Sequence, residues 1–216
     1  MCPMRPSVEA AINMHPIARV LLGKLRDENT PNVLFRQYLH HLSMMMAIQA
    51  LEGLHLENGE VTTPLGVRAQ VPFILESTHA FVPIMRAGQG MLGAFQEMIP
   101  GALVWHMDMD RDEETHRPNF RGSKVPKVIS RGTTCYVLDP MLATGGSACA
   151  AVAHLKKHGA KRIIYVAIIA ANAGAARLNK EHRDVKIHVT AIDPELNENA
   201  FIVPGLGDAG DRQWRK

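Results

Sequence analysis

The chain is poor in aromatic residues and cysteines, and it contains no long apolar run. Only 5% of its 216 residues are aromatic, so the core has to be built mainly from Ala, Val, Ile, Leu and Met. No apolar stretch of about 18 residues, secretion signal or lipidation signal occurs, and we therefore expect no membrane partner. The cysteines Cys2, Cys135 and Cys149 are odd in number and lack the spacing of metal ligands. These features predict reduced thiols and a cytoplasmic location.

The charges of the chain are nearly balanced. Its formal net charge of +3 at pH 7 suits anionic small molecules but is too small to indicate a nucleic-acid partner. The 11 histidines show neither an HExxH motif nor another paired ligand spacing, and no Ser/His/Asp set is evident. Because a cluster of carboxylates is also missing, the sequence predicts no metal ion held by the protein alone.

The expected elements indicate a single α/β domain. The spacing of apolar residues predicts helices over 8–26 and 34–56. From about residue 79, short apolar strands alternate with helices, a pattern typical of a mostly parallel sheet with right-handed crossovers. The strands are expected at 79–85, 102–107, 135–138, 162–169 and 186–191, and the helices at 87–99, 147–158 and 173–182. Residues 108–131 lack periodicity and are expected to form an exposed arm.

The segment from Cys135 to Ser147 carries the clearest chemical signal. An apolar strand ends at Asp139, and a turn with Gly145 and Gly146 leads to Ser147, a favourable residue for capping a helix N-terminus. A helix N-terminus exposes backbone N–H groups and a partial positive charge, and glycines let the backbone approach a phosphate closely. The carboxylate of Asp139 can accept hydrogen bonds from sugar hydroxyls. Together these features indicate a phosphorylated sugar as the ligand.

The residues Asp139-Pro-Met-Leu-Ala-Thr-Gly-Gly-Ser147 resemble the phosphoribosyl diphosphate motif of type I phosphoribosyltransferases, in the form found in the uracil phosphoribosyltransferase family. Further segments match that family in its own order, at residues 83–91, 111–115 and 204–212. The resemblance spans about residues 15–212. It implies a type I phosphoribosyltransferase fold, with a central, mostly parallel sheet flanked by helices, a small hood and a flexible β-arm. The expected parts of this single domain, 1–216, are N-terminal helices at 7–57, a core at about 79–192, the arm at about 108–131 and a base-binding segment at 193–216.

The resemblance implies an enzyme of pyrimidine salvage. It would transfer the phosphoribosyl group from phosphoribosyl diphosphate to uracil and release uridine monophosphate and diphosphate. Mg2+ would arrive with the donor rather than bind the protein directly. The family also implies a homodimer or homotetramer, and control by guanosine triphosphate, which some relatives show, stays open.

The resemblance also assigns the site residues. Asp139 would stabilise cationic charge on the ribose while Arg86 and Arg111 neutralise the diphosphate, so these are the expected catalytic residues. The donor is expected to contact Arg86, Arg111, Asp139, Pro140, Met141, Leu142, Ala143, Thr144, Gly145, Gly146, Ser147 and Asp208. Uracil is expected to meet the backbone of Ile202, Gly207, Asp208 and Ala209.

The glycine segment and the fold also allow other interpretations. The segment Gly205-Leu-Gly-Asp-Ala-Gly210 matches the GxGxxG pattern of dinucleotide sites, but the few residues after it leave no room for the required helix and strand. One alternative function is a regulator of the same fold that binds nucleotides and RNA, and another is a transferase for a different nucleobase. The chain also has Asp110 where the family usually has tyrosine, a departure that concerns the arm.

Overall fold

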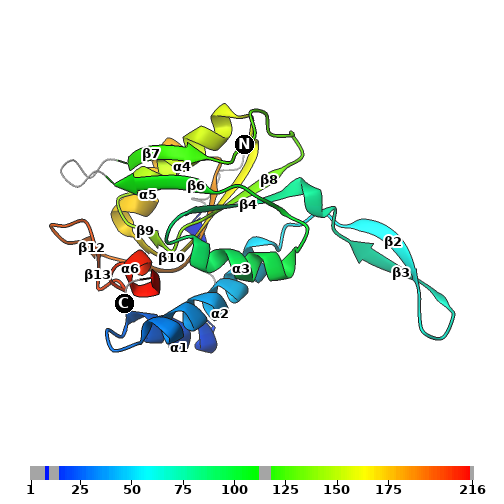
Figure 1. The fold of residues 1–216 in the computed structure, drawn as a ribbon, viewed down its shortest axis with the longest axis horizontal. Helices are drawn as coiled ribbons and strands as arrows, with labels where there is room; N and C mark the ends of the chain where they lie inside the picture. Colours follow the sequence, from blue (N-terminus) through cyan, green and yellow to red (C-terminus); the bar gives the residue numbers. More distant parts are fainter. Residues whose placement is uncertain (1–7, 10–14, 112–117, 215–216) are drawn as a thin grey trace, which may run out of the picture.

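The computed structural model describes residues 8–9, 15–111 and 118–214, and most of these residues are arranged around one sheet (Figure 1). Its strands lie in the order β1-β11-β10-β8-β4-β6-β7, with β5 beside β4 and β9 beside β10. Among the described strands of this sheet, the pairings are parallel except between β6 and β7. The bounds are β1 (Val8–Glu9), β4 (His79–Met85), β5 (Leu103–Val104), β6 (Met107–Arg111), β7 (Pro118–Ser123), β8 (Thr134–Leu138), β9 (Met141–Leu142), β10 (Arg162–Ala171) and β11 (Lys186–Asp193). The predicted central, mostly parallel sheet is confirmed.

Helices cover both faces of this sheet. One face packs against α1 (Pro16–Arg26), α2 (Asn32–Ala50) and α3 (Gln89–Met98), and the other against α4 (Gly146–Lys157) and α5 (Asn172–Glu181). Successive strand residues serve opposite faces, as the pleat requires: Tyr136 packs with α2 and α3, and Val137 packs with α4. None of the helices in the described ranges is long and apolar enough to cross a membrane.

The prediction for the N-terminal region is partly wrong. Val8 and Glu9 form a strand parallel to β11 rather than the start of a helix, and α1 begins only at Pro16. The side chain of His15 caps α1 by accepting a hydrogen bond from the backbone N–H of Ile17 at 3.2 Å. The second helix ends at Ala50, several residues before the expected 56, because the chain turns at 51–53.

A hairpin that the sequence pattern did not predict follows α2. Its strands, β2 (Glu57–Thr62) and β3 (Arg68–Phe73), pair antiparallel and project far from the body of the molecule (Figure 1). Most of its side chains are exposed, so the alternation of buried and exposed residues that identifies a strand is missing. Gly66 adopts a φ of +75° in the connecting turn.

The predicted exposed arm at 108–131 is instead an ordered antiparallel hairpin over much of its length. β6 and β7 pair with each other, and Met109 and Ile129 are buried, so the prediction of an exposed segment without regular structure is wrong for this part. Residues 112–117 and the side chains of Asp110 and Arg111 lie outside the described part of the structure. The β-arm implied by the resemblance corresponds to this hairpin, and its flexibility stays a prediction.

Candidate active site

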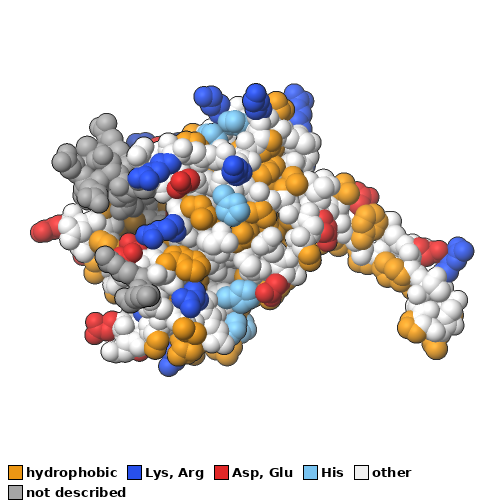
Figure 2. Space-filling view, in the orientation of Figure 1, with side chains coloured by type: hydrophobic (Ala, Val, Ile, Leu, Met, Phe, Trp, Pro, Cys, Tyr) orange, Lys and Arg blue, Asp and Glu red, His pale blue; other side chains and the backbone are white. Residues whose placement is uncertain are grey.

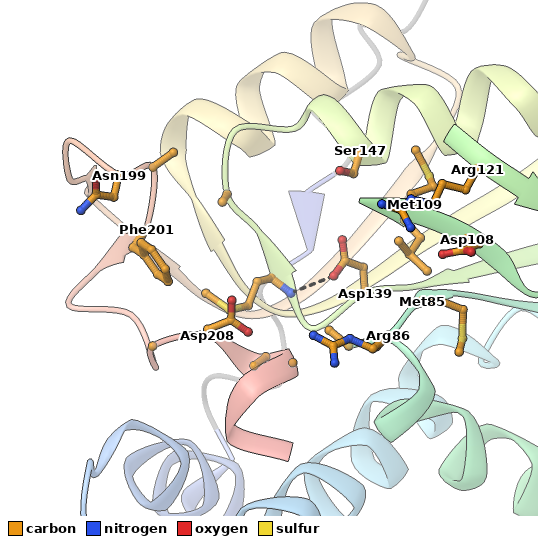
Figure 3. A pocket seen from close by; sticks show the side chains of 18 residues that line it. Met85, Arg86, Asp108, Met109, Arg121, Asp139, Ser147, Asn199, Phe201 and Asp208 are labelled. Carbon is orange, nitrogen blue, oxygen red and sulfur yellow. Dashed lines mark hydrogen bonds between the residues drawn. The ribbon is translucent and has the colours of Figure 1, made fainter. Parts of the chain in front are cut away.

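A cavity of about 770 Å³ lies at the carboxyl edge of the parallel strands (Figure 3). Open α/β sheets bind ligands at this edge, where the loops that follow the strands converge. The walls come from the ends of β4 and β8, the β6–β7 hairpin and the start of α4. Residues 199–201 after β12 (Glu195–Leu196) and residues 207–210, which lead into α6 (Ala209–Trp214), complete them. Segments far apart in the sequence thus share one cavity.

Most predicted site residues meet in this cavity. Its lining includes Arg86, Asp139, Met141, Ala143, Ser147, Gly207, Asp208 and Ala209. The predicted residues Thr144, Gly145 and Gly146 lie between two of these in the chain, while Pro140, Leu142 and Ile202 are buried beside the cavity rather than lining it. Arg111 ends β6, but its side chain lies outside the described residues, so its role stays a prediction.

Asp139 stands at the end of β8 and is held by two donors. The hydroxyl of Tyr165 donates to its Oδ2 at 2.9 Å, and the backbone N–H of Met141 donates to its Oδ1 at 3.4 Å. Figure 3 draws the bond to Oδ1 as a dashed line. Burial raises the pKa of Tyr165 well above its usual value, and the adjacent Asp139 adds to this effect. Tyr165 is therefore a neutral donor that orients the carboxylate. Sequence reasoning missed Tyr165 because it lies within an apolar strand.

The turn before α4 brings backbone N–H groups to the cavity. Gly145, at a φ of +78°, is the residue that precedes the helix, so the predicted cap at Ser147 is wrong by two positions. Ser147 lies in the first helical turn and lines the cavity. The turn packs tightly against α5: a Cβ added to Gly174 would lie 2.3 Å from the backbone oxygen of Ala143. This turn can cradle a phosphate, since the first N–H groups of a helix have no partner within it.

Arg86 lies in the loop between β4 and α3. The peptide bond between Met85 and Arg86 is cis, and Gly88 packs so closely that an added Cβ would lie 2.2 Å from the Leu138 backbone oxygen. The side chain of Arg86 is 71% exposed, and its contact with Asp211 is long, at 3.9 Å. Such a pair contributes little to stability, so the guanidinium can turn to an anionic ligand.

The segment that ends in Gly207–Ala209 is held by a partly buried ion pair. Arg26 donates to both carboxylate oxygens of Asp193, at 2.7 and 2.6 Å, and also to the backbone oxygen of Gly205 at 2.7 Å. Asp193 in turn accepts from the N–H of Gly205 at 2.9 Å. Gly205 has a φ of +62°, and an added Cβ would lie 1.9 Å from the Ile202 oxygen. Sequence reasoning missed Arg26 and Asp193, which are far apart in the chain.

A second arginine fixes the same segment from α6. Arg212 lies 4.4 Å above the ring of Phe35, and it donates to the backbone oxygens of Leu206 at 2.9 Å, Asp27 at 2.5 Å and Leu25. Burial lowers the pKa of Arg212, against the opposing effect of Asp27. The segment that carries Gly207 is thus attached to the N-terminal helices.

The cavity also contains residues that the sequence did not indicate. They come from the β6–β7 hairpin and from the loop that follows β12: Asp108, Met109, Arg121, Asn199, Ala200 and Phe201. The hairpin residues lie in a stretch without periodicity, so no pattern indicated which of its side chains face a ligand.

One further cluster of potential metal ligands lies away from this cavity in the described part of the chain. It consists of Cys149, Glu181 and His182. Burial raises the pKa of Cys149 to about 12, and a hydrogen bond to Glu181 adds to this, so the thiol is protonated at neutral pH.

The turn before α4, the carboxylate at the strand end and the cavity at the sheet edge together form a site that suits a phosphorylated sugar. Residues 12–215 match the family model described as uracil phosphoribosyltransferase. The chain is 43% identical over 198 residues to the uracil phosphoribosyltransferase of Thermoanaerobacter sp. (strain X514), covering 92% of this chain and 93% of that one. The chain therefore belongs to the uracil phosphoribosyltransferase family, which confirms the predicted resemblance.

Two other relatives extend this comparison. The uracil phosphoribosyltransferase of Chlamydia muridarum is 38% identical over 208 residues, which make up 96% of this chain and 68% of that protein. The solved structure of the AQ2163 protein from Aquifex aeolicus superimposes with a TM-score of 0.87 at 34% identity, over 93% of this chain and 95% of that one. The fold is thus shared along nearly the whole chain.

Proposed function

We propose that this protein transfers the phosphoribosyl group from phosphoribosyl diphosphate to uracil, giving uridine monophosphate and diphosphate. The observation that carries this proposal is the position of Asp139 and the α4 turn opposite Gly207–Ala209 in one cavity. A donor held at the turn would place its reacting carbon near Asp139, with a base at the glycine segment within reach.

The chemistry follows from these positions. The bond between the ribose carbon and diphosphate breaks, and the cationic charge that develops on the ribose is stabilised by the Asp139 carboxylate, which Tyr165 orients. The N1 atom of uracil attacks the opposite face while the electron pair of the broken bond leaves with diphosphate, and the N1 proton passes to water. The configuration at this carbon therefore inverts. Since little covalent chemistry falls to the protein, catalysis rests on positioning and charge stabilisation.

The diphosphate has to be neutralised as it leaves. Arg86 lines the cavity and suits this role, and Arg111 is proposed for it as well. Mg2+ is proposed to enter with the donor, where it would neutralise the charge of the leaving group. The carboxylates of Asp139 and Asp208 both line the cavity and offer oxygen atoms to the water shell of such an ion.

Base selection is assigned to the backbone of residues 207–209 and of Ile202. Backbone N–H and C=O groups can match the donors and acceptors on the edge of uracil, whereas cytosine would leave a buried group without a partner. A direct test is diphosphate release with uracil, cytosine, orotate and hypoxanthine in parallel. Release with uracil alone is expected, whereas stronger release with another base would refute the assignment.

We further propose that the chain forms a homodimer or homotetramer. The projecting β2–β3 hairpin presents apolar side chains that the described part of the chain leaves exposed (Figure 2), among them Val61, Leu65 and Val67. Exposed apolar patches of this kind often mark protein interfaces. Light scattering should show a defined oligomer, and Val67→Asp should shift it toward the monomer. A monomer before the substitution would refute this part of the proposal. A cytoplasmic location stays a prediction from the cysteines.

A further inference from the structure

The β6–β7 hairpin contains a bulge, and Arg121 is the extra residue in it. The pairing runs from Met107 with Ser123 to Asp108 with Gly122, but Met109 then pairs with Phe120, so Arg121 has no partner position on β6. A bulge of this kind redirects a side chain, and bulges are common beside active sites. The side chain of Arg121 accordingly lines the cavity, next to Asp108 and Met109 of β6 (Figure 3).

The residues on both sides of Arg121 are fixed to α4. The ring of Phe120 lies 4.5 Å from the ring of His154, and the hydroxyl of Ser123 is hydrogen-bonded to Nε2 of the same histidine at 2.9 Å. Farther along the chain, Nδ1 of His158 donates to the backbone oxygen of Pro126 at 2.7 Å. α4 is also the helix whose N-terminus forms the phosphate-binding turn. The backbone around Arg121 is therefore anchored to the same helix as the donor site.

The position of the hairpin indicates which end of the donor Arg121 faces. β6 pairs with β4, with Met85 opposite Asp108, so the hairpin lies beside the strand that leads to Arg86. The glycine segment 207–209, by contrast, lines the cavity from the start of α6, near the C-terminus. Arg121 thus belongs to the side of the cavity assigned to the leaving group rather than to the base.

The charges that line the cavity also support placing Arg121 at the diphosphate end of the donor. Besides Arg86, Arg121 is the cationic side chain among the described residues that line the cavity, which also presents the carboxylates of Asp108, Asp139 and Asp208. A donor with a phosphate and a diphosphate carries several negative charges, and a second guanidinium in the described lining would offset part of them. The planar guanidinium can bind two oxygens of a diphosphate at once, which a lysine ammonium cannot do.

We propose that Arg121 binds the diphosphate of the donor, as a binding residue in addition to Arg86 and Arg111. This inference rests on the proposed function because it assumes that donor. The bulge turns Arg121 into the cavity, and the contacts of Phe120 and Ser123 with α4 keep it there. The hairpin therefore contributes to donor binding through β7 as well as through β6.

The test compares Arg121→Ala and Arg121→Lys with Lys124→Ala. Lys124 is the matched control because it is an exposed cation of the same segment that does not line the cavity. Removing a charged hydrogen-bonding partner should raise the KM for phosphoribosyl diphosphate about tenfold or more in Arg121→Ala. The KM for phosphoribosyl diphosphate of Arg121→Lys should lie between those of Arg121→Ala and the unchanged protein. The KM for uracil and the melting temperature should stay the same, and Lys124→Ala should change none of these quantities.

Calorimetry with the two parts of the donor, diphosphate and ribose 5-phosphate, tests the assignment of Arg121 to the diphosphate without any turnover. Titration of magnesium diphosphate should show about tenfold weaker binding to Arg121→Ala, whereas ribose 5-phosphate should bind both proteins alike. Equal diphosphate binding by both proteins, or a loss confined to ribose 5-phosphate, would overturn the proposal. Failure of the unchanged protein to bind diphosphate would overturn it as well. If diphosphate binding behaves as expected but uracil is not converted, the proposed function fails and the role of Arg121 stands.

Discussion

The part of the cavity proposed to hold the ribose and its phosphate comes from one short stretch of chain, whereas the base side is assembled from segments far apart. Asp139 directly follows β8 and Ser147 lies in the first turn of α4, so both belong to a single strand–turn–helix unit. The glycine segment 207–209, by contrast, depends on an ion pair between Arg26 and Asp193, residues 167 positions apart. The part for the ribose and its phosphate therefore lies in one continuous segment, while the base side depends on contacts between segments far apart in the chain. Substitutions far from uracil should damage base binding and leave donor binding intact.

The largest effect is expected from Gly207→Val, which adds a β-branched side chain at a residue with a φ of +76°. The added Cβ would also lie 3.4 Å from the side chain of Arg212. Uracil binding should fall below detection in calorimetry, with the donor still binding at the α4 turn. Gly66→Val is a matched control, because Gly66 has a similar φ of +75° in the distant β2–β3 hairpin. Equal loss of both ligands in Gly207→Val would show that the two sides cannot be separated.

Asp139→Asn should reduce turnover roughly one hundredfold or more with little change in the KM for the donor. The carboxylate lies where cationic charge is proposed to develop, so its loss affects the transition state more than the ground state. Steady-state kinetics with varied donor would separate the two constants. Tyr165→Phe removes the hydroxyl that orients Asp139 and should cause a smaller loss of the same kind. Normal turnover of Asp139→Asn would mean that Asp139 has no catalytic role.

Asp193→Asn tests the long-range support of the base side. It should lower the free energy of unfolding by about 2 kcal/mol, less than the roughly 3–5 kcal/mol of a fully buried pair, because Arg26 is 24% exposed. The KM for uracil should rise while the KM for the donor stays close to normal. Glu181→Gln is the control, since it breaks an exposed pair with Arg177 and should have little effect. An equal rise in both KM values would contradict the separate construction of the two sides.

The smallest expected effect is a dependence of the melting temperature on pH. Burial lowers the pKa of His79, and burial together with His158 and Lys157 lowers the pKa of His154. A lowered histidine pKa means that the unfolded chain binds protons more readily. Stability is therefore complete above the unfolded value, about 6.5, and decreases as the pH falls from there through the folded pKa. The melting temperature should be a few degrees lower at pH 5 than at pH 7.5, and His79→Phe should reduce this difference. A flat pH profile over this range would contradict the prediction.

The parts of the molecule that follow local patterns could be predicted from the sequence. The strand 79–85 was predicted with the bounds of β4, and the strand–turn–helix unit around Asp139 was found nearly in register. Apolar runs mark buried parallel strands, and glycines mark turns that bind phosphate, so both leave a local signal. Six of the twelve predicted donor residues accordingly line one cavity.

The parts that depend on tertiary contacts could not be predicted. In the sequence, Tyr165 cannot be told from the other residues of an apolar strand. Its hydrogen bond to Asp139 forms only because β8 and β10 are adjacent in the sheet. The bulge at Arg121 arises from how β6 and β7 pair, which no residue pattern in this stretch specifies. The strand at Val8–Glu9 likewise exists only because β11 lies beside it. The role of Arg111 stays a prediction.

The central claim is that the two sides of the cavity join uracil to the ribose of the donor. The most direct measurement is NMR of the products formed from phosphoribosyl diphosphate and Mg2+, with and without an equal amount of uracil. We predict one diphosphate for each uridine monophosphate formed, with inverted configuration at the reacting carbon, and almost no diphosphate without uracil. Release of diphosphate and ribose 5-phosphate at the same rate in both samples would contradict the account.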